Sequence, residues 1–232
     1  MSTGERLDQV RQLRERGLAP KQIAKTLGIG SAEASRLVRA VAAAARTAAP
    51  EPRVVGCWVS PTWSTGLTIA GHPEWPRDED TAAETGGMVA VLVAREHRYD
   101  KIDICGYLVD VYCLGLKNIY DHKVMDEHEL RAFVHAYFDA YHGDPIEAPI
   151  ELAREIVFGA IEYARGLGFE PHPGWPDVEG HLGSWSGPSV ITFGNDGKPF
   201  YIDGPYDNSR SVIRTLERTV GAGNFEYIAT AF

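Results

Sequence analysis

With 232 residues, 44% of them hydrophobic, the chain is long enough for one large domain or for a small and a medium one, and its composition excludes global disorder. No apolar run approaches the roughly 18 to 20 residues of a membrane span, and the N-terminus lacks the apolar centre of a signal peptide. We therefore expect a cytoplasmic protein with no membrane partner. Cys57, Cys105 and Cys113 form no CxxC pair, which argues against a disulfide framework and a ribbon-type zinc site, so we expect reduced, buried thiols.

The net charge of −9 conceals an asymmetry between the two ends of the chain. Residues 1–53 hold ten Lys/Arg against five Asp/Glu, a balance of +5, whereas the remaining residues hold 13 against 27, a balance of −14. A basic segment followed by an acidic one is typical of a protein that meets a polyanion through its basic part alone.

The basic segment predicts three short helices. Gly17 and Gly28 stand where helix C-caps belong, and Pro20 suits the first turn of the second helix. The third helix is expected in "SAEASRLVRAVAAAA", after a turn of about three residues. The apolar positions at helical spacing are Leu7, Val10, Leu13 and Leu18, then Ile23, Ala24 and Leu27, then Ala34, Leu37 and Val38.

The string "KQIAKTLGIGSAEASRLVRAV" resembles the helix-turn-helix of resolvases, transposases and small bacterial regulators. The positions that match are Ala24 at the helix crossing, Gly28 in the turn, Ile29 after it and Leu37 in the recognition helix. The string departs from the pattern at Gly30, where serine usually caps the recognition helix, and at Ala34, where valine or isoleucine usually packs. The resemblance covers about 40 residues and implies double-stranded DNA as a partner.

A recognition helix in the major groove would present its outward N-terminal residues to base edges: Ser31, Ala32, Ser35, Arg36 and, one turn on, Arg39. Arg36 would form a bidentate contact with guanine, while Lys21 and Lys25 would contact phosphates. A single unit of this kind needs a dimer to reach two half-sites, so we expect a homo-oligomer. The alternative is a three-helix unit that contacts protein, or one that has lost DNA binding.

The alanine-rich stretch after the third helix breaks at Pro50 and Pro52. We therefore predict a helix-turn-helix domain at residues 1–48, the head, a linker at 49–53, and a second domain at 54–232, the body.

The body predicts an α+β fold with an antiparallel sheet and flanking helices. A strand is expected in "RVVGCWVS", a loop-like segment at 61–87, and a hairpin whose two apolar runs flank "EHRYDK". Helices are expected in "DEHELRAFVHAYFDAYH" and in "PIELAREIVFGAIEYARGLGF", which ends at Gly166 or Gly168. A second hairpin is expected around "GNDGK", followed by a helix in "NSRSVIRTLERTVG" capped by Asp207 or Asn208.

The stretch "LVDVYCLGLK", residues 108–117, predicts part of a central strand from Ile102 to Leu116, because both alternating faces are mainly apolar. Asp110 should then be buried and needs a partner, for which Lys117 is a candidate.

Three chemical interpretations of this stretch stay open. In the first, Asp110 with Glu151 or Glu155 holds a divalent cation for hydrolysis. In the second, Cys113 is a nucleophile activated by His135 or His181. In the third, Asp110 caps a neighbouring segment and Cys113 fills the core. Asp110, Cys113 and Lys117 are thus the candidate catalytic residues, and since no standard catalytic or nucleotide-binding motif accompanies them, we predict no cofactor.

Two further segments, "HPGW" and "HLGSWSGPS", predict a glycine-rich loop that either lines a ligand pocket or covers a core edge. Their histidines, His172 and His181, lie nine residues apart without a cysteine near them in the sequence, which matches no standard zinc spacing.

A second resemblance spans roughly residues 54–232: "LVDVYCLGLKN", "AIEYARGLGFEPHP" and "GKPFYIDGPYDN" resemble a bacterial family of unassigned function. It implies a discrete module and no particular activity. Three functions remain: a DNA-binding transcriptional regulator whose body dimerises or senses a small-molecule ligand, a metal-dependent hydrolase or nuclease guided by the head, and a protein-interaction module of a mobile-element or defence system.

Overall fold

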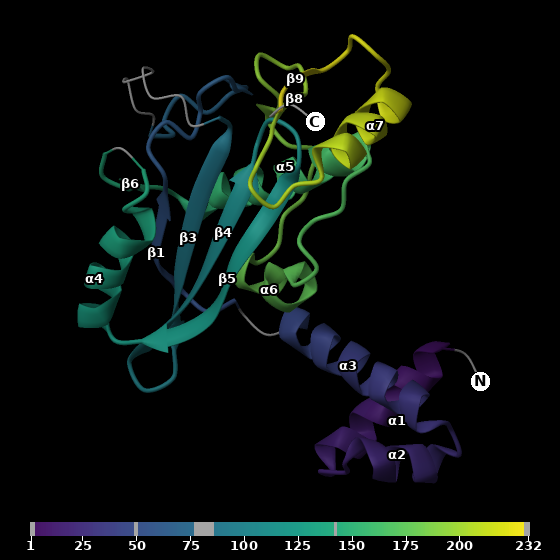
Figure 1. Ribbon diagram of the computed structural model, residues 1–232. Coiled ribbons are helices and arrows are strands. Elements are labelled where there is room, and N and C mark those ends of the chain that lie inside the picture. The colour runs from purple at the N-terminus through teal and green to yellow at the C-terminus, as the bar shows by residue number, and fades with distance from the viewer. Residues whose placement is uncertain (1–2, 49–50, 77–85, 142, 230–232) are drawn as a thin grey trace. The chain divides into compact units, whose positions relative to one another are not determined.

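The computed structural model describes residues 3–48, 51–76, 86–141 and 143–229 (Figure 1). Its internal contacts divide the chain into two units, Met1–Glu51 and Pro52–Phe232. Residues 49 and 50 of the predicted linker lie outside the described residues. The chain has the predicted α+β fold: helices alone form the first unit, while the second combines helices with an antiparallel sheet.

The N-terminal unit contains the three predicted helices, α1 (Thr3–Glu15), α2 (Pro20–Leu27) and α3 (Ser31–Ala48). Both α1 and α2 pack against α3. The buried core contains Val10, Ile23, Leu37 and Val41, and most of the other predicted apolar positions pack against it partly buried: Leu7, Leu13, Leu18, Leu27 and Val38. Most polar positions between them are exposed, as expected for amphipathic helices around one small core.

The centre of the body is a five-stranded antiparallel sheet in the order β5-β4-β3-β1-β6. Its strands are β1 (Val54–Val59), β3 (Met88–His97), β4 (Lys101–Asp110), β5 (Gly115–Met125) and β6 (Ile146–Glu147). The β3–β4 hairpin is the one predicted around "EHRYDK". As the outermost strand, β5 has one backbone edge that pairs with no other strand among those described.

Helices cover both faces of this sheet (Figure 1). On one face, α4 (Glu127–Phe138) packs Leu130, Val134 and Phe138 against the even-numbered residues of β3 and β4. On the other face, α5 (Ile150–Leu167) and α6 (Trp175–Leu182) pack against the odd-numbered residues of these strands. A strand covered on both faces has no solvent side, which explains why six consecutive residues of β3, from Val89 to Ala94, are apolar and buried.

The remaining elements form the C-terminal part of the body. Two short sheets pair β2 (Thr68–Ile69) with β7 (Ile191–Thr192) and β8 (Phe200–Ile202) with β9 (Glu226–Ile228). The last helix, α7 (Ser209–Thr219), is capped by the Asn208 side chain, one of the two residues predicted for this role. Its buried residues join Cys113, Leu167, Tyr201 and Phe225 in a separate small core.

The predicted continuous strand from Ile102 to Leu116 is wrong. Strand β4 ends at Asp110, residues 111–114 form a turn, and β5 returns antiparallel from Gly115. Gly115 is required there, because its φ is +69° and a Cβ would lie 2.7 Å from the Ala164 Cβ and 2.9 Å from the Ala160 carbonyl oxygen of α5. Both faces of the turn are apolar because it packs against the core.

Two further predictions require correction. The "GNDGK" turn is present, with an isolated bridge between Asn195 and Lys198, but the strands on either side of it pair with β2 and β9 and not with each other. The glycine-rich loop expected at 172–189 contains helix α6, whose last turn carries His181. Among the described residues, no helix is both long enough and apolar enough to cross a membrane.

Candidate functional site

The head presents a basic surface on α2 and α3. Lys21 and Lys25 on α2 are exposed, as are Arg36 and Arg39 on α3, and the apolar face of each helix lies in the core. At the start of α3, Ser31 and Ala32 are exposed and Ser35 is half-buried. The predicted contact residues therefore occupy the outer side of the two helices.

A tight left-handed turn joins these two helices. Gly28 has φ +64° and ψ +31° and ends α2, with its N–H bonded to the Ala24 carbonyl. The Gly30 carbonyl accepts the Ala34 N–H at 2.9 Å, which places Gly30 at the N-cap of α3. A residue other than glycine adopts the Gly28 conformation at a cost, so this residue allows the chain to turn directly from one helix into the next.

Few acidic residues accompany this basic surface. From Arg16 to Pro50, Arg16 included, the sequence has six Lys/Arg and a single acid, Glu33. The Glu33 carboxylate lies 2.9 Å from the guanidinium of Arg6 on α1, so its charge is paired. The outer side of α2 and α3 thus carries net positive charge, as a surface that binds phosphates needs.

Asp110, the first candidate catalytic residue, closes the turn between β4 and β5. Its Oδ1 accepts the N–H groups of Tyr112 and Cys113 at 2.9 and 3.0 Å, and its Oδ2 accepts that of Leu114 at 3.1 Å. The residue is 4% exposed, and burial raises its pKa to about 6, against the opposing effect of the three amides and of Lys117. Its carboxylate therefore serves the backbone, which corresponds to the capping interpretation.

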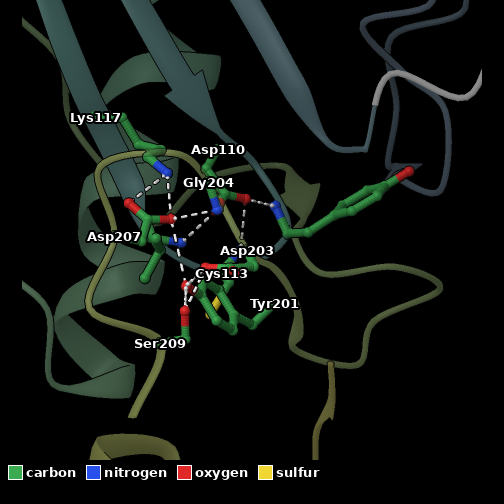
Figure 2. Close-up of polar contacts among 10 residues, drawn as sticks. Asp110, Cys113, Lys117, Tyr201, Asp203, Gly204, Asp207 and Ser209 are labelled. Atoms are coloured by element: carbon green, nitrogen blue, oxygen red, sulfur yellow. Dashed lines mark hydrogen bonds and ion pairs between the residues drawn. The ribbon is translucent and has the colours of Figure 1, made fainter. Parts of the chain in front are cut away.

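Lys117, the candidate partner of Asp110, forms its ion pair with Asp207 instead. The Lys117 ammonium lies 2.9 and 2.7 Å from the two carboxylate oxygens of Asp207 (Figure 2). Asp207 also accepts the Gly204 N–H at 3.1 Å. The same close-up shows Tyr201 beside Asp203, Asp207 and Ser209, so the loop before α7 is a continuous polar network that ties β5 to the C-terminal part of the body.

Cys113 does not have the surroundings of a nucleophile. It is fully buried beneath α7, and burial raises the pKa of its thiol. The two proposed bases lie elsewhere: His135 is on α4, at the opposite face of the sheet, and His181 is beside Cys105. The carboxylates of Asp110 and Asp207 also raise the pKa of this thiol, and the opposing effect of the nearby Lys117 does not offset burial.

The candidate metal ligands Asp110, Glu151 and Glu155 do not form a metal site. Glu151 is exposed on α5, and Glu155 is occupied by the following loop: it accepts the Trp185 Nε1–H at 2.8 Å, the Ser189 hydroxyl at 2.6 Å and the Val190 N–H at 3.0 Å. Asp110 is occupied by its own turn. Among the described residues, potential ligand atoms lie close together in another group of three side chains.

That group consists of Cys105 on β4, His122 on β5 and His181 in α6, whose potential ligand atoms all lie within 4.8 Å of one another. Asp103, two residues before Cys105, places its Oδ2 2.7 Å from His122 Nδ1 and 3.6 Å from His181 Nδ1. Cys105 and His181 are buried, and burial lowers the pKa of His181 to about 4. All three cysteines are free and buried, as predicted. We call these four residues the Cys105 cluster.

The sequence gives no spacing signal for this cluster. Its members come from two strands and a helix, so His181 is remote from any cysteine along the chain but lies beside Cys105 in space. The signal that could have been used is local: Asp103 and Cys105 alternate on the face of β4 that packs against α5 and α6.

A groove of about 860 Å³ lies on the other face of the sheet, between α4 and the β3–β4 hairpin. Its lining mixes apolar and charged side chains, among them Trp58, Lys101, Leu130 and Arg131. Its size is in the range of small-molecule sites.

No protein-family model, no curated protein and no solved structure matches this chain.

Proposed function

We propose that the protein binds double-stranded DNA through its head and acts as a transcriptional regulator. The observation that supports this most directly is the exposure of Lys21, Lys25, Arg36 and Arg39 on the outer side of two helices joined by the Gly28 turn. Basic side chains on a surface without unpaired acids attract the phosphate backbone, and a helix behind a tight turn can enter the major groove.

In this arrangement α3 is the recognition helix. Its exposed N-terminal residues, Ser31 and Ala32, would lie against base edges, with Arg36 reaching guanine and Arg39 a phosphate or base one turn later. Lys21 and Lys25 on α2 would fix the register on the backbone. Since serine and alanine discriminate little between bases, Arg36 would carry most of the specificity.

The charge of the body supports the same orientation. Residues 54–232 carry −14, so phosphates repel the body while they attract the head. The body would then dimerise, which brings two heads to two half-sites, or bind a small molecule in the groove beside α4. Apart from Leu116, whose carbonyl accepts the His172 N–H at 2.9 Å, the outer edge of β5 pairs with no other described strand and would be available for a second copy.

The alternative of a hydrolase built on Asp110, Glu151 and Glu155 gains no support, because two of these carboxylates bond to neighbouring backbone or side chains and the third is exposed. The interaction-module alternative predicts no affinity for DNA, so one experiment separates it from regulation.

The experiment is selection of a preferred duplex from a random pool, followed by fluorescence anisotropy with that duplex and with a scrambled one at several salt concentrations. Arg36→Ala should lose roughly 1–3 kcal/mol on the selected duplex and much less on the scrambled one. The Lys21→Ala/Lys25→Ala variant should weaken binding to both and flatten the salt dependence.

Arg11→Ala is the matched control, since Arg11 is an exposed arginine on α1, outside the proposed interface. If Arg11→Ala and Arg36→Ala weaken binding equally, the head attracts DNA by charge alone. If the wild-type protein binds neither duplex at low salt, the proposal fails.

A further inference from the structure

The Cys105 cluster combines ligand types that rarely meet by chance. Cys105 offers a thiol from β4, while His122 and His181 offer ring nitrogens from β5 and α6. The ligand atoms lie within 4.8 Å of one another, whereas atoms that share one tetrahedral ion at about 2.0–2.3 Å each lie roughly 3.3–3.8 Å apart. Side-chain movements of about 1 Å would complete such a site.

A β-bulge places His122 opposite Cys105. Ile104 pairs with Lys123 and Gly106 pairs with Tyr120, so two residues of β5, Asp121 and His122, face the single residue Cys105. A bulge of this kind redirects a side chain and is frequent beside functional sites. Without the extra residue, only one residue of β5 would lie opposite Cys105.

Hydrogen bonds hold the two imidazoles in defined orientations. The Val93 carbonyl can only accept, so the 3.1 Å contact with His181 Nε2 leaves Nδ1 of the neutral ring with a lone pair. His122 Nδ1 donates to Asp103 Oδ2 at 2.7 Å. A metal-binding histidine commonly donates its other N–H to a backbone carbonyl or a carboxylate in this way, which fixes its tautomer.

The carboxylate of Asp103 lacks a positive partner beside His181. His181 Nδ1 lies 3.6 Å from Asp103 Oδ2, which sets a lone pair against a carboxylate oxygen. The second oxygen of Asp103, Oδ1, is buried and has no hydrogen-bond partner. Buried carboxylate oxygens without partners are costly and rare, and a cation between the imidazoles and the thiolate would offset that cost.

The frame that carries His181 is rigid. The guanidinium of Arg95, buried in β3, donates to the backbone carbonyls of His181 and Leu182, and Arg154 of α5 donates to the Leu182 carbonyl at 2.8 Å. These two arginines fix the C-terminal end of α6 against the sheet. On the opposite side, His122 is 40% exposed, so an ion can enter from solvent and keep a water ligand.

We propose that Cys105, His122 and His181 bind a divalent transition-metal ion, with Asp103 holding His122. A thiolate with two imidazoles suits Zn²⁺ or Co²⁺ and disfavours Mg²⁺ and Ca²⁺, which prefer oxygen ligands. Three protein ligands with one solvent position correspond to an open zinc site. This inference goes beyond DNA binding and does not depend on it.

The test uses the untagged, reduced, full-length chain, because an added histidine tag would bind metal itself. Co²⁺ is titrated while the thiolate-to-cobalt charge-transfer band is recorded, and Zn²⁺ is then added in competition. All cysteines and histidines of the chain lie at residue 57 or beyond, so the head contributes no ligand of these types. The expected result is saturation at one equivalent, with the band removed by Zn²⁺.

Variants separate this site from unspecific binding. Cys105→Ser should abolish the band, and His122→Ala and Asp103→Asn should each weaken binding at least tenfold. Cys57→Ser and His128→Ala, a buried thiol and an exposed imidazole outside the cluster, should bind like the wild type. Circular dichroism confirms that each variant is folded; His122 is exposed enough for its replacement to leave the core intact.

The absence of a saturable band in the wild type would overturn the proposal, as would a band of unchanged strength in both Cys105→Ser and His122→Ala. Rapid alkylation of Cys105 by iodoacetamide near pH 7, together with no uptake of metal, would also overturn the proposal. It would show that the cluster is a reactive thiolate–imidazole pair and not a metal site.

Discussion

Asp110 Oδ1 accepts the backbone N–H of Cys113 at 3.0 Å, and this contact explains how an apolar stretch can reverse direction inside the body. The sequence from Val111 to Leu114 contains no residue typical of turns. The carboxylate supplies the acceptors that a turn backbone would otherwise lack, and Gly115 supplies the space against α5.

Asp110→Asn should therefore destabilise the body at pH 7. The amide of asparagine keeps one acceptor oxygen but turns an NH₂ group toward at least one buried N–H, so we expect a loss of roughly 1–3 kcal/mol in the free energy of unfolding. Urea denaturation measures it. Asp100→Asn is the control, because Asp100 is exposed in the β3–β4 turn at φ +54°, which asparagine tolerates. Equal free energies of unfolding for the two variants would show that Asp110 does not stabilise the fold.

The pH dependence of this loss tests the buried charge. Burial raises the pKa of Asp110 from 3.8 to about 6, so the folded state holds the proton more tightly than the unfolded state. Protonation of Asp110 therefore stabilises the folded state. This contribution is complete below pH 3.8 and is lost as pH rises through 6, which lowers the free energy of unfolding by up to about 3 kcal/mol. The deficit of Asp110→Asn relative to wild type should thus shrink between pH 4 and pH 7. A deficit that grows would show that the amide hydrogen bonds outweigh burial.

The ion pair between Lys117 and Asp207 should contribute measurably, because their side chains are only 22% and 12% exposed. We expect a coupling energy of about 1–2 kcal/mol in a double-mutant cycle of Lys117→Met and Asp207→Asn. An exposed pair, Arg131 and Glu127, provides the comparison and should give less than about 0.5 kcal/mol. Equal coupling in both cycles would mean that the network before α7 adds nothing to the pair.

Two glycines of the head should respond in opposite directions. Gly28→Ala forces an alanine into φ +64°, and we expect a loss of about 1 kcal/mol. Gly30→Ser introduces a capping hydroxyl at the N-terminus of α3 and should gain a few tenths of a kcal/mol. Thermal unfolding of the variants gives both values. A neutral Gly28→Ala would indicate that the turn is looser than its geometry implies.

Elements that depend on local interactions were predictable from the sequence, and those that depend on distant ones were not. The three head helices and the helices α4, α5 and α7 were predictable because their periodicity, caps and terminal glycines are local. The turn after Asp110 was not, because a side chain replaces the usual turn residues. Helix α6 was missed because it is short and contains Pro176 and Gly180, which are typical of loops.

The candidate sites follow the same division. The exposure of Arg36 and Lys21 follows from helical spacing, so the surface proposed for DNA was open to prediction. The Cys105 cluster was not, because His122 reaches it through a bulge and His181 through the packing of α6 on the sheet. Neither the register of a bulge nor the docking of a short helix is encoded in neighbouring residues.

The most direct test of the central claim is genome-wide crosslinking and immunoprecipitation of the tagged protein, comparing the wild type with Lys21→Ala/Lys25→Ala/Arg36→Ala/Arg39→Ala. These four side chains are exposed, so the variant should fold and be expressed like the wild type. A regulator that reads DNA through its head predicts discrete peaks that disappear in the variant. No peaks from a well-expressed wild type, or peaks that persist unchanged in the variant, would contradict it.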